Sequence, residues 1–178
     1  VIVPRKTVLE LSKLLADDDE EVGIELSSTQ AAFSFGSIEL VSKLIDGKFP
    51  DYTRVIPTQH KNILSVERET LRSALLRAAI LSNEKFRGVR WVIGDDSLKI
   101  VSSNAEQEEA QEEVDVKYAG APLDIGFNAN YLLEVLRYMP SDEVKLSFKA
   151  PERAATVEPT EDSQGAYLCL IMPLRLLE

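Results

Sequence analysis

Apolar residues recur at helical spacing in three places along the chain. The spacing predicts helices over about residues 4–15, 67–81 and 129–139. Pro4 suits the first helical turn, Asn128 is a suitable N-cap, and Pro140 stops the third helix. We expect the inward faces to carry Val8, Leu11 and Leu15, then Leu71, Leu75 and Ala78, and finally Leu132, Leu136 and Met139.

Segments of alternating polarity follow each helix and predict strands. They cover residues 22–26, 31–35 and 38–44, then 89–93, 98–100 and 114–118, and finally 144–148, 155–157 and 167–172. Two further strands, at 62–66 and 123–127, precede the second and third helices. Asp95 and Asp96 predict a tight hairpin.

A unit of one helix and three strands therefore recurs three times, at a spacing of roughly 60 residues. Two such units are expected to pair into one α+β domain, with helices on one side and sheets on the other. On this reading, residues 59–178 form a complete domain and residues 1–58 the second half of a preceding one. The chain is interpreted as a fragment of a longer protein.

Composition narrows the possible functions. The chain has 178 residues, 44% of them hydrophobic, which is enough for a packed core. Its net charge of −10 argues against nucleic-acid binding in general, although basic helices could still face a nucleic acid while acids lie elsewhere. The single cysteine, Cys169, excludes an internal disulfide and suits a reducing cytoplasm; we expect it to be a small buried residue on a strand.

Candidate catalytic chemistry is weak. The single histidine, His60, cannot build a metal site with one distant cysteine, and neither a nucleophile set nor a glycine-rich phosphate loop is present. The acidic run from Glu106 to Glu113 could supply hydrolytic carboxylates or bind calcium, but an exposed loop and sheet edge is the favoured interpretation. We predict a protein without catalytic residues, metal or cofactor.

Three stretches carry a family resemblance. They are LIDGKFPDY at residues 44–52 with Arg54 and Val55 just beyond, AAILSNEKFRGVR at residues 78–90, and MPLRL at residues 172–176. In these stretches, and in their order, the chain resembles the bacterial DNA polymerase III β-subunit family, the ring-shaped sliding clamps. The resemblance covers essentially the whole chain.

This resemblance implies an architecture and a set of partners. Members have three similar domains, and two chains close head to tail into a ring around duplex DNA, which is bound without sequence specificity. The ring tethers polymerase, clamp-loader subunits and other replication or repair proteins. Each partner carries a short motif, a glutamine followed by leucines and a terminal phenylalanine, which docks in an apolar cleft. The resemblance also implies a bacterial cytoplasmic protein that is a homodimer at full length, whereas this chain alone is expected to be monomeric.

The resemblance also implies roles for individual residues. Leu170 joins the cleft because it lies one strand pleat from Met172. The other cleft residues are Pro50, Arg54, Val55, Phe86, Asn128, Tyr131, Met172, Pro173, Leu174 and Arg175. Arg5, Lys6, Arg72 and Arg77 would face DNA, and Ile80 and Leu81 would form the ring interface. Because two adjacent apolar residues on a helix cannot both face one core, one of this last pair should be exposed.

Other readings stay open at this point. Leu170 and Met172 could simply fill the core, Pro50 could end a strand, and the helix cations could be ordinary solvated charges. A free-standing peptide-binding module of the same fold, which never forms a ring, would show the same cleft. A hydrolase with paired carboxylates would instead place a perturbed acid in a concave pocket.

Overall fold

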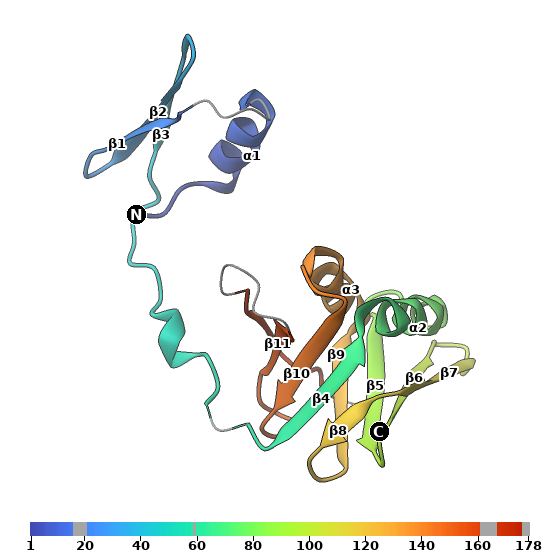
Figure 1. Cartoon of the computed structure of the whole chain (residues 1–178). Helices are drawn as coiled ribbons and strands as arrows, with labels where there is room; N and C mark the ends of the chain where they lie inside the picture. Colours follow the sequence, from blue (N-terminus) through green and yellow to red (C-terminus); the bar gives the residue numbers. More distant parts are fainter. Residues whose placement is uncertain (16–20, 59, 161–166, 176–178) are drawn as a thin grey trace. The chain divides into compact units, whose positions relative to one another are not determined.

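The computed structural model describes residues 1–15, 21–58, 60–160 and 167–175. Leu176 of the last sequence stretch lies outside the described residues. The chain divides into two compact units, Val1–Tyr52 and Thr53–Glu178, each described below by itself (Figure 1). The sequence-based division at residues 58 and 59 lies a few residues after this boundary.

The first unit contains one helix and a three-stranded antiparallel meander. Its elements are α1 (Arg5–Leu14), β1 (Gly23–Leu26), β2 (Gln30–Phe35) and β3 (Ile38–Lys43), with sheet order β1-β2-β3. Pro4 is the N-cap of α1, in agreement with the predicted start of the helix. The Thr7 and Ser42 hydroxyls are 2.6 Å apart and join the helix to β3. Small and aromatic side chains of β2 form the core, namely Ala31, Phe33 and Phe35.

The predicted inner face of α1 is only partly correct. Leu11 packs on the core, but Val8 is 52% exposed and Leu15 is 38% exposed, while Thr7 occupies the buried position. The edge strand β1 is exposed throughout, with Ile24 at 60% and Leu26 at 57%. One helix over three strands does not cover all the apolar side chains that the periodicity assigns to the inside.

The second unit contains two copies of the predicted repeat. After the short 3-10 helix η1 (Tyr52–Arg54), the first copy comprises β4 (Asn62–Glu67), α2 (Arg68–Ile80), β5 (Gly88–Gly94), β6 (Ser97–Ser103), β7 (Glu109–Asp115) and β8 (Lys117–Ala119). The second comprises β9 (Leu123–Asn128), α3 (Ala129–Tyr138), β10 (Glu143–Phe148), β11 (Ala155–Pro159) and β12 (Cys169–Ile171). The helices predicted over residues 67–81 and 129–139 are thus confirmed to within a residue at each end.

The two copies interlock by exchanging strands. The strands form a five-stranded sheet, β12-β11-β10-β4-β8, and a four-stranded sheet, β7-β6-β5-β9. The strand before α2 pairs with the strand after α3 (β4 with β10), and the strand before α3 pairs with the strand after α2 (β9 with β5). Figure 1 shows α2 and α3 side by side above the strands. This arrangement confirms the predicted α+β domain of two paired repeats.

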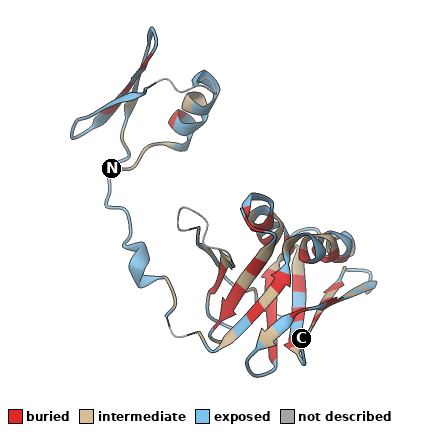
Figure 2. Cartoon of the chain, viewed as in Figure 1, coloured by how far each residue is buried: buried red, intermediate tan, exposed pale blue. Residues whose placement is uncertain are grey.

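One continuous core holds the second unit together (Figure 2). Trp91 lies at its centre, with its ring 5.3 Å from that of Phe127 and inclined by 70°, an edge-to-face arrangement. The ring of Phe127 is in turn 6.4 Å from that of Phe148. The predicted inward residues of α2 and α3 are all buried: Leu71, Leu75, Ala78, Leu132, Leu136 and Met139.

Two predicted strands differ from the structure. The strand expected over residues 114–118 is divided at Val116, because β7 ends in one sheet and β8 begins in the other. The strand expected over residues 167–172 pairs only over Cys169–Ile171, and Pro173, which has no N–H for a ladder, follows its C-terminal end. The Asp95–Asp96 turn has φ values of 51° and 57° and forms the predicted hairpin. β7 includes part of the acidic run and is a sheet edge, as expected.

Candidate docking groove and adjacent surfaces

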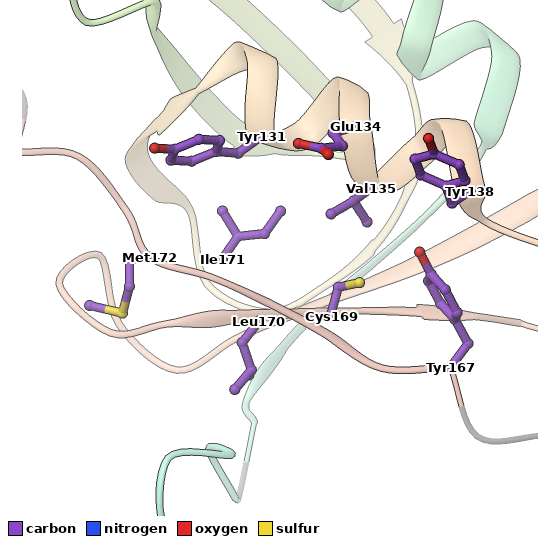
Figure 3. Close-up of a pocket in the computed structure, with 9 residues that line it drawn as sticks. All are labelled: Tyr131, Glu134, Val135, Tyr138, Tyr167, Cys169, Leu170, Ile171 and Met172. Atoms are coloured by element: carbon purple, nitrogen blue, oxygen red, sulfur yellow. The ribbon is translucent and has the colours of Figure 1, made fainter. Parts of the chain in front are cut away.

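An apolar groove of about 470 Å³ lies between α3 and the last strand (Figure 3). One wall is a helical stripe at spacing i, i+3, i+4 and i+7, which places four side chains on one face of α3. These are Tyr131, Glu134, Val135 and Tyr138. The opposite wall is the segment around β12, with Tyr167, Cys169, Leu170, Ile171 and Met172. The groove therefore presents mostly aliphatic and aromatic surface, which is typical of ligand-binding concavities.

Three of the predicted cleft residues meet in this groove. Tyr131 and Met172 lie at the same end of it in Figure 3 and are 61% and 66% exposed, while Leu170 is at the border of exposed. The alternative that Leu170 and Met172 fill the core does not hold, since Ile171 between them is the buried side chain of this segment. Exposed apolar side chains gathered in a concavity are a surface suited to binding.

Asn128 organises the end of the groove where α3 begins. Its Oδ1 accepts hydrogen bonds from the backbone N–H of Asn130 at 2.9 Å and of Tyr131 at 3.4 Å, so it caps the helix as predicted. Its Nδ2 donates to the carbonyl oxygen of Phe86 at 3.1 Å. The side-chain amide therefore holds the Tyr131 turn and the Phe86 segment, rather than projecting freely toward a ligand.

The C-terminal residues reach this same region. The backbone N–H of Leu174 donates to the carbonyl oxygen of Gly126 at 2.8 Å, which adds an isolated bridge next to β9. Phe86 is 57% exposed, and the ammonium of Lys85 lies 5.2 Å from its ring centroid. Pro173 is half-buried and Arg175 is exposed. Leu174 is thus bridged to β9 two residues before Asn128, the N-cap of α3.

The remaining predicted cleft residues lie on the segment around η1. Pro50 belongs to the first unit and is exposed; Arg54 ends η1, and Val55 follows it, both also exposed. None of the three is among the described residues that line the groove. Their part in a cleft stays a prediction from the sequence.

Six groove residues were missed by the sequence reasoning. Glu134, Val135 and Tyr138 could have been found by extending the helical stripe from Tyr131, because helical periodicity places them on its face. Nothing local in the sequence marks the other three as neighbours of that helix, and they are Tyr167, Cys169 and Ile171.

Tyr167 and Cys169 interact within the groove wall. Burial, together with the neighbouring Cys169 thiol, raises the pKa of the Tyr167 hydroxyl to about 12, so the ring stays neutral at physiological pH. Cys169 is a free cysteine, half-buried and packed against the core, so it is less deeply buried than the sequence predicts.

The predicted DNA-facing cations differ in their surroundings. Arg5 and Lys6 are exposed in the first turn of α1. Arg72 lies 3.4 Å from a Glu69 carboxylate oxygen on the same helix. Arg77 instead makes a two-pronged pair with Glu112 of β7, at 2.9 and 2.6 Å, which lowers the pKa of the Glu112 carboxyl. Arg77 is therefore the least available of the four for a phosphate.

Ile80 and Leu81 lie at the end of α2. Ile80 is 75% exposed, whereas Leu81 is only partly exposed. The expectation that one of two adjacent apolar residues would be exposed is thus confirmed. The open edge strand β7 packs on the same helix, so an unpaired strand edge accompanies the exposed isoleucine.

The described lining of the groove does not supply the paired carboxylates of the hydrolase alternative. Among its described residues, the groove contains one carboxylate, Glu134, where a paired-acid hydrolase needs two. Among the described residues, no three His, Cys, Asp or Glu side chains are grouped so that they could hold a metal ion. No described helix is both long and apolar enough to cross a membrane.

Comparison with known proteins assigns the family. Residues 53–175 match the family model for the DNA polymerase III beta subunit, C-terminal domain, and residues 1–51 match the model for its central domain. The beta sliding clamps of Pseudomonas aeruginosa and Vibrio cholerae are 46% and 44% identical over 176 residues, and each alignment covers 99% of this chain. A crystal structure of the P. aeruginosa sliding clamp bound to griselimycin matches with a TM-score of 0.91 and 45% identity, covering 99% of this chain and 47% of that one.

The chain spans about half the length of these relatives, 47% and 48% for the two clamps. Both family models align in chain order with the two compact units. The chain therefore belongs to the DNA polymerase III β-subunit family of bacterial sliding clamps, and it corresponds to the C-terminal portion of such a protein.

Proposed function

We propose that this chain is the partner-docking portion of a DNA polymerase processivity clamp. The observation that carries the proposal is the groove between α3 and β12, where Tyr131, Leu170 and Met172 expose apolar surface in one concavity. Its occupant would be a short linear segment of a polymerase, a clamp-loader subunit or another replication or repair protein. The function requires binding alone, without a cofactor or a catalytic residue.

The chemistry of the groove supports a peptide occupant. Methionine is unbranched and adapts its shape, so Met172 could accept different apolar side chains from different partners. The tyrosine at the opposite wall offers a rigid ring with a polar tip, a combination enriched at recognition surfaces. Asn128 fixes the backbone beneath this ring, which limits the ordering cost of binding.

In the full-length protein, the ring would close through Ile80, Leu81 and the open edge of β7. An exposed isoleucine beside an unpaired strand is a surface that a second chain could cover by extending the sheet. The exposed cations Arg5 and Lys6, with Arg72, would contact DNA phosphates without reading sequence. We place the protein in the bacterial cytoplasm, and we expect the 178-residue chain alone to be monomeric.

The test is a titration of a fluorescent peptide that carries the motif of a glutamine, leucines and a terminal phenylalanine. We expect saturable binding to the wild-type chain. Met172→Ala should weaken binding about tenfold or more, because burying an apolar side chain of this size against the peptide contributes about 1.5–3 kcal/mol. Met172 is 66% exposed, so its truncation should leave the fold intact.

The matched control is Leu76→Ala, which truncates an exposed apolar side chain on α2, outside the groove. This variant should bind as the wild type does. Absence of saturable binding, or an equal loss in both variants, would contradict the docking proposal. The same titration with Pro50→Ala and Val55→Ala tests the cleft residues predicted from the sequence on the segment around η1.

A further inference from the structure

The groove changes character along its length (Figure 3). Met172 and Tyr131 lie at one end, and Tyr138 and Tyr167 lie at the other. Glu134 projects from α3 between the two tyrosines of that helix, at spacing i+3 from the first. Glu134 thus places a carboxylate in the middle of the groove, between the Met172 end and an end formed by two tyrosines.

Glu134 is the charged member of the described groove lining. Its side chain is exposed and makes no ion pair or hydrogen bond within the described ranges. An apolar segment laid along the groove would desolvate this carboxylate without compensation, which is unfavourable. An acidic segment would be repelled, so charge complementarity selects a cation.

The surrounding rings suit a cation as well. The face of a tyrosine ring attracts ammonium and guanidinium groups. Tyr138 already shows this contact within the chain, because the guanidinium of Arg137 lies 5.5 Å from its ring centroid. The hydroxyl of Tyr167 stays protonated and adds no competing charge.

We infer that Glu134, together with the adjoining tyrosine end of the groove, binds a lysine or arginine that flanks the apolar docking motif of a partner. The apolar residues of the partner would occupy the Met172 end, and the basic side chain would lie between Glu134, Tyr138 and Tyr167. The inference rests on the proposed docking function and specifies the chemistry of the partner: an apolar motif with an adjacent basic residue.

The experiment compares motif peptides that differ in one flanking residue, either lysine or its uncharged counterpart norleucine. Lysine is placed before the motif in one pair of peptides and after it in another, so that either binding direction is sampled. For the favoured position we expect the lysine peptide to bind the wild-type chain about three- to tenfold more tightly, from an exposed ion pair and a cation–π contact together. Added salt should reduce this advantage but leave norleucine-peptide binding unchanged.

Two charge-removing variants separate a local effect from the general attraction of a chain with net charge −10. Glu134→Gln should abolish the lysine advantage, whereas Glu152→Gln, an exposed carboxylate on the turn between β10 and β11, should retain it. An advantage that persists in Glu134→Gln, or its absence at both positions in the wild type, overturns the inference. Failure of the norleucine peptides to bind at all is a different result, because it removes the docking function together with this inference.

Discussion

Replacing Asn128 with alanine tests how far the start of α3 depends on one side chain. The substitution removes the cap acceptor for the N–H groups of Asn130 and Tyr131, and the donor to the carbonyl of Phe86. A lost N-cap costs about 1 kcal/mol. The lost hydrogen bond to Phe86 costs about another 1 kcal/mol. We therefore expect the free energy of unfolding of the second unit to fall by about 2 kcal/mol.

Urea unfolding followed by tryptophan fluorescence measures this change. Trp91 is the single tryptophan of the chain and is fully buried in the second unit, so its emission reports on that unit. With a denaturant slope of about 2 kcal/mol per molar urea, the Asn128→Ala midpoint should lie about 1 M below that of the wild type. The slope itself should not change.

Asn128→Ser is the matched control, because serine retains a capping oxygen but not the donor to Phe86. It should lose about half as much stability as the alanine variant. The reasoning is refuted if alanine costs less than about 0.5 kcal/mol, or if serine costs as much as alanine, since the cap would then contribute nothing.

Three further predictions follow from the second unit. The hydrogen bond from the Thr70 side chain is the main cause that lowers the pKa of the Glu67 carboxyl from its ordinary value of 4.5. The ionised carboxylate therefore stabilises α2 above pH 4.5, and this stabilisation is lost as the pH falls through the lowered pKa. Urea midpoints of wild type and Glu67→Gln should accordingly differ at pH 7 and converge in acid; a constant gap would contradict this. Gly120→Ala should cost about 1–3 kcal/mol, because the added Cβ would lie 2.8 Å from Asn62 Cα, and an unchanged midpoint would refute the clash. Residues 53–178 alone should unfold at the urea midpoint of the full chain, and a clear decrease would show that the first unit supports this core.

The sequence predicted the helices of the second unit well because their inward faces are covered. The inward stripes of α2 and α3 are covered by the two sheets, so periodicity and burial agree. The same pattern in α1 was misleading for Val8 and Leu15, since periodicity tells which residues share a face and not whether that face is covered. Likewise, alternation could not show that the chain changes sheets at Val116, because strand partners are distant in sequence.

The groove illustrates the same limit at the functional site. The family resemblance supplied Tyr131 and Met172, strand alternation added Leu170, and the structure places all three in the lining of one groove. Tyr138 and Tyr167 line one groove only because α3 packs beside β12, and the strands β10 and β11 lie between these two elements in the chain. No local pattern encodes that contact, so the two-tyrosine end of the groove beside Glu134 becomes visible only in three dimensions.

Exposed apolar residues have two different origins in this chain, and only one supports a docking site. β1 follows α1 as β5 follows α2 and β10 follows α3, but β5 and β10 each have two strand neighbours whereas β1 has one. The exposure of Ile24 and Leu26 therefore reflects an open sheet edge. Around Met172, by contrast, both groove walls are anchored: Leu132 and Leu136 of α3 are buried, and so is Ile171 of β12. β12 is also an edge strand, but α3 packs beside it, so the exposed apolar surface around Met172 lines a concavity rather than an open edge, and the proposed docking function is best assigned to it.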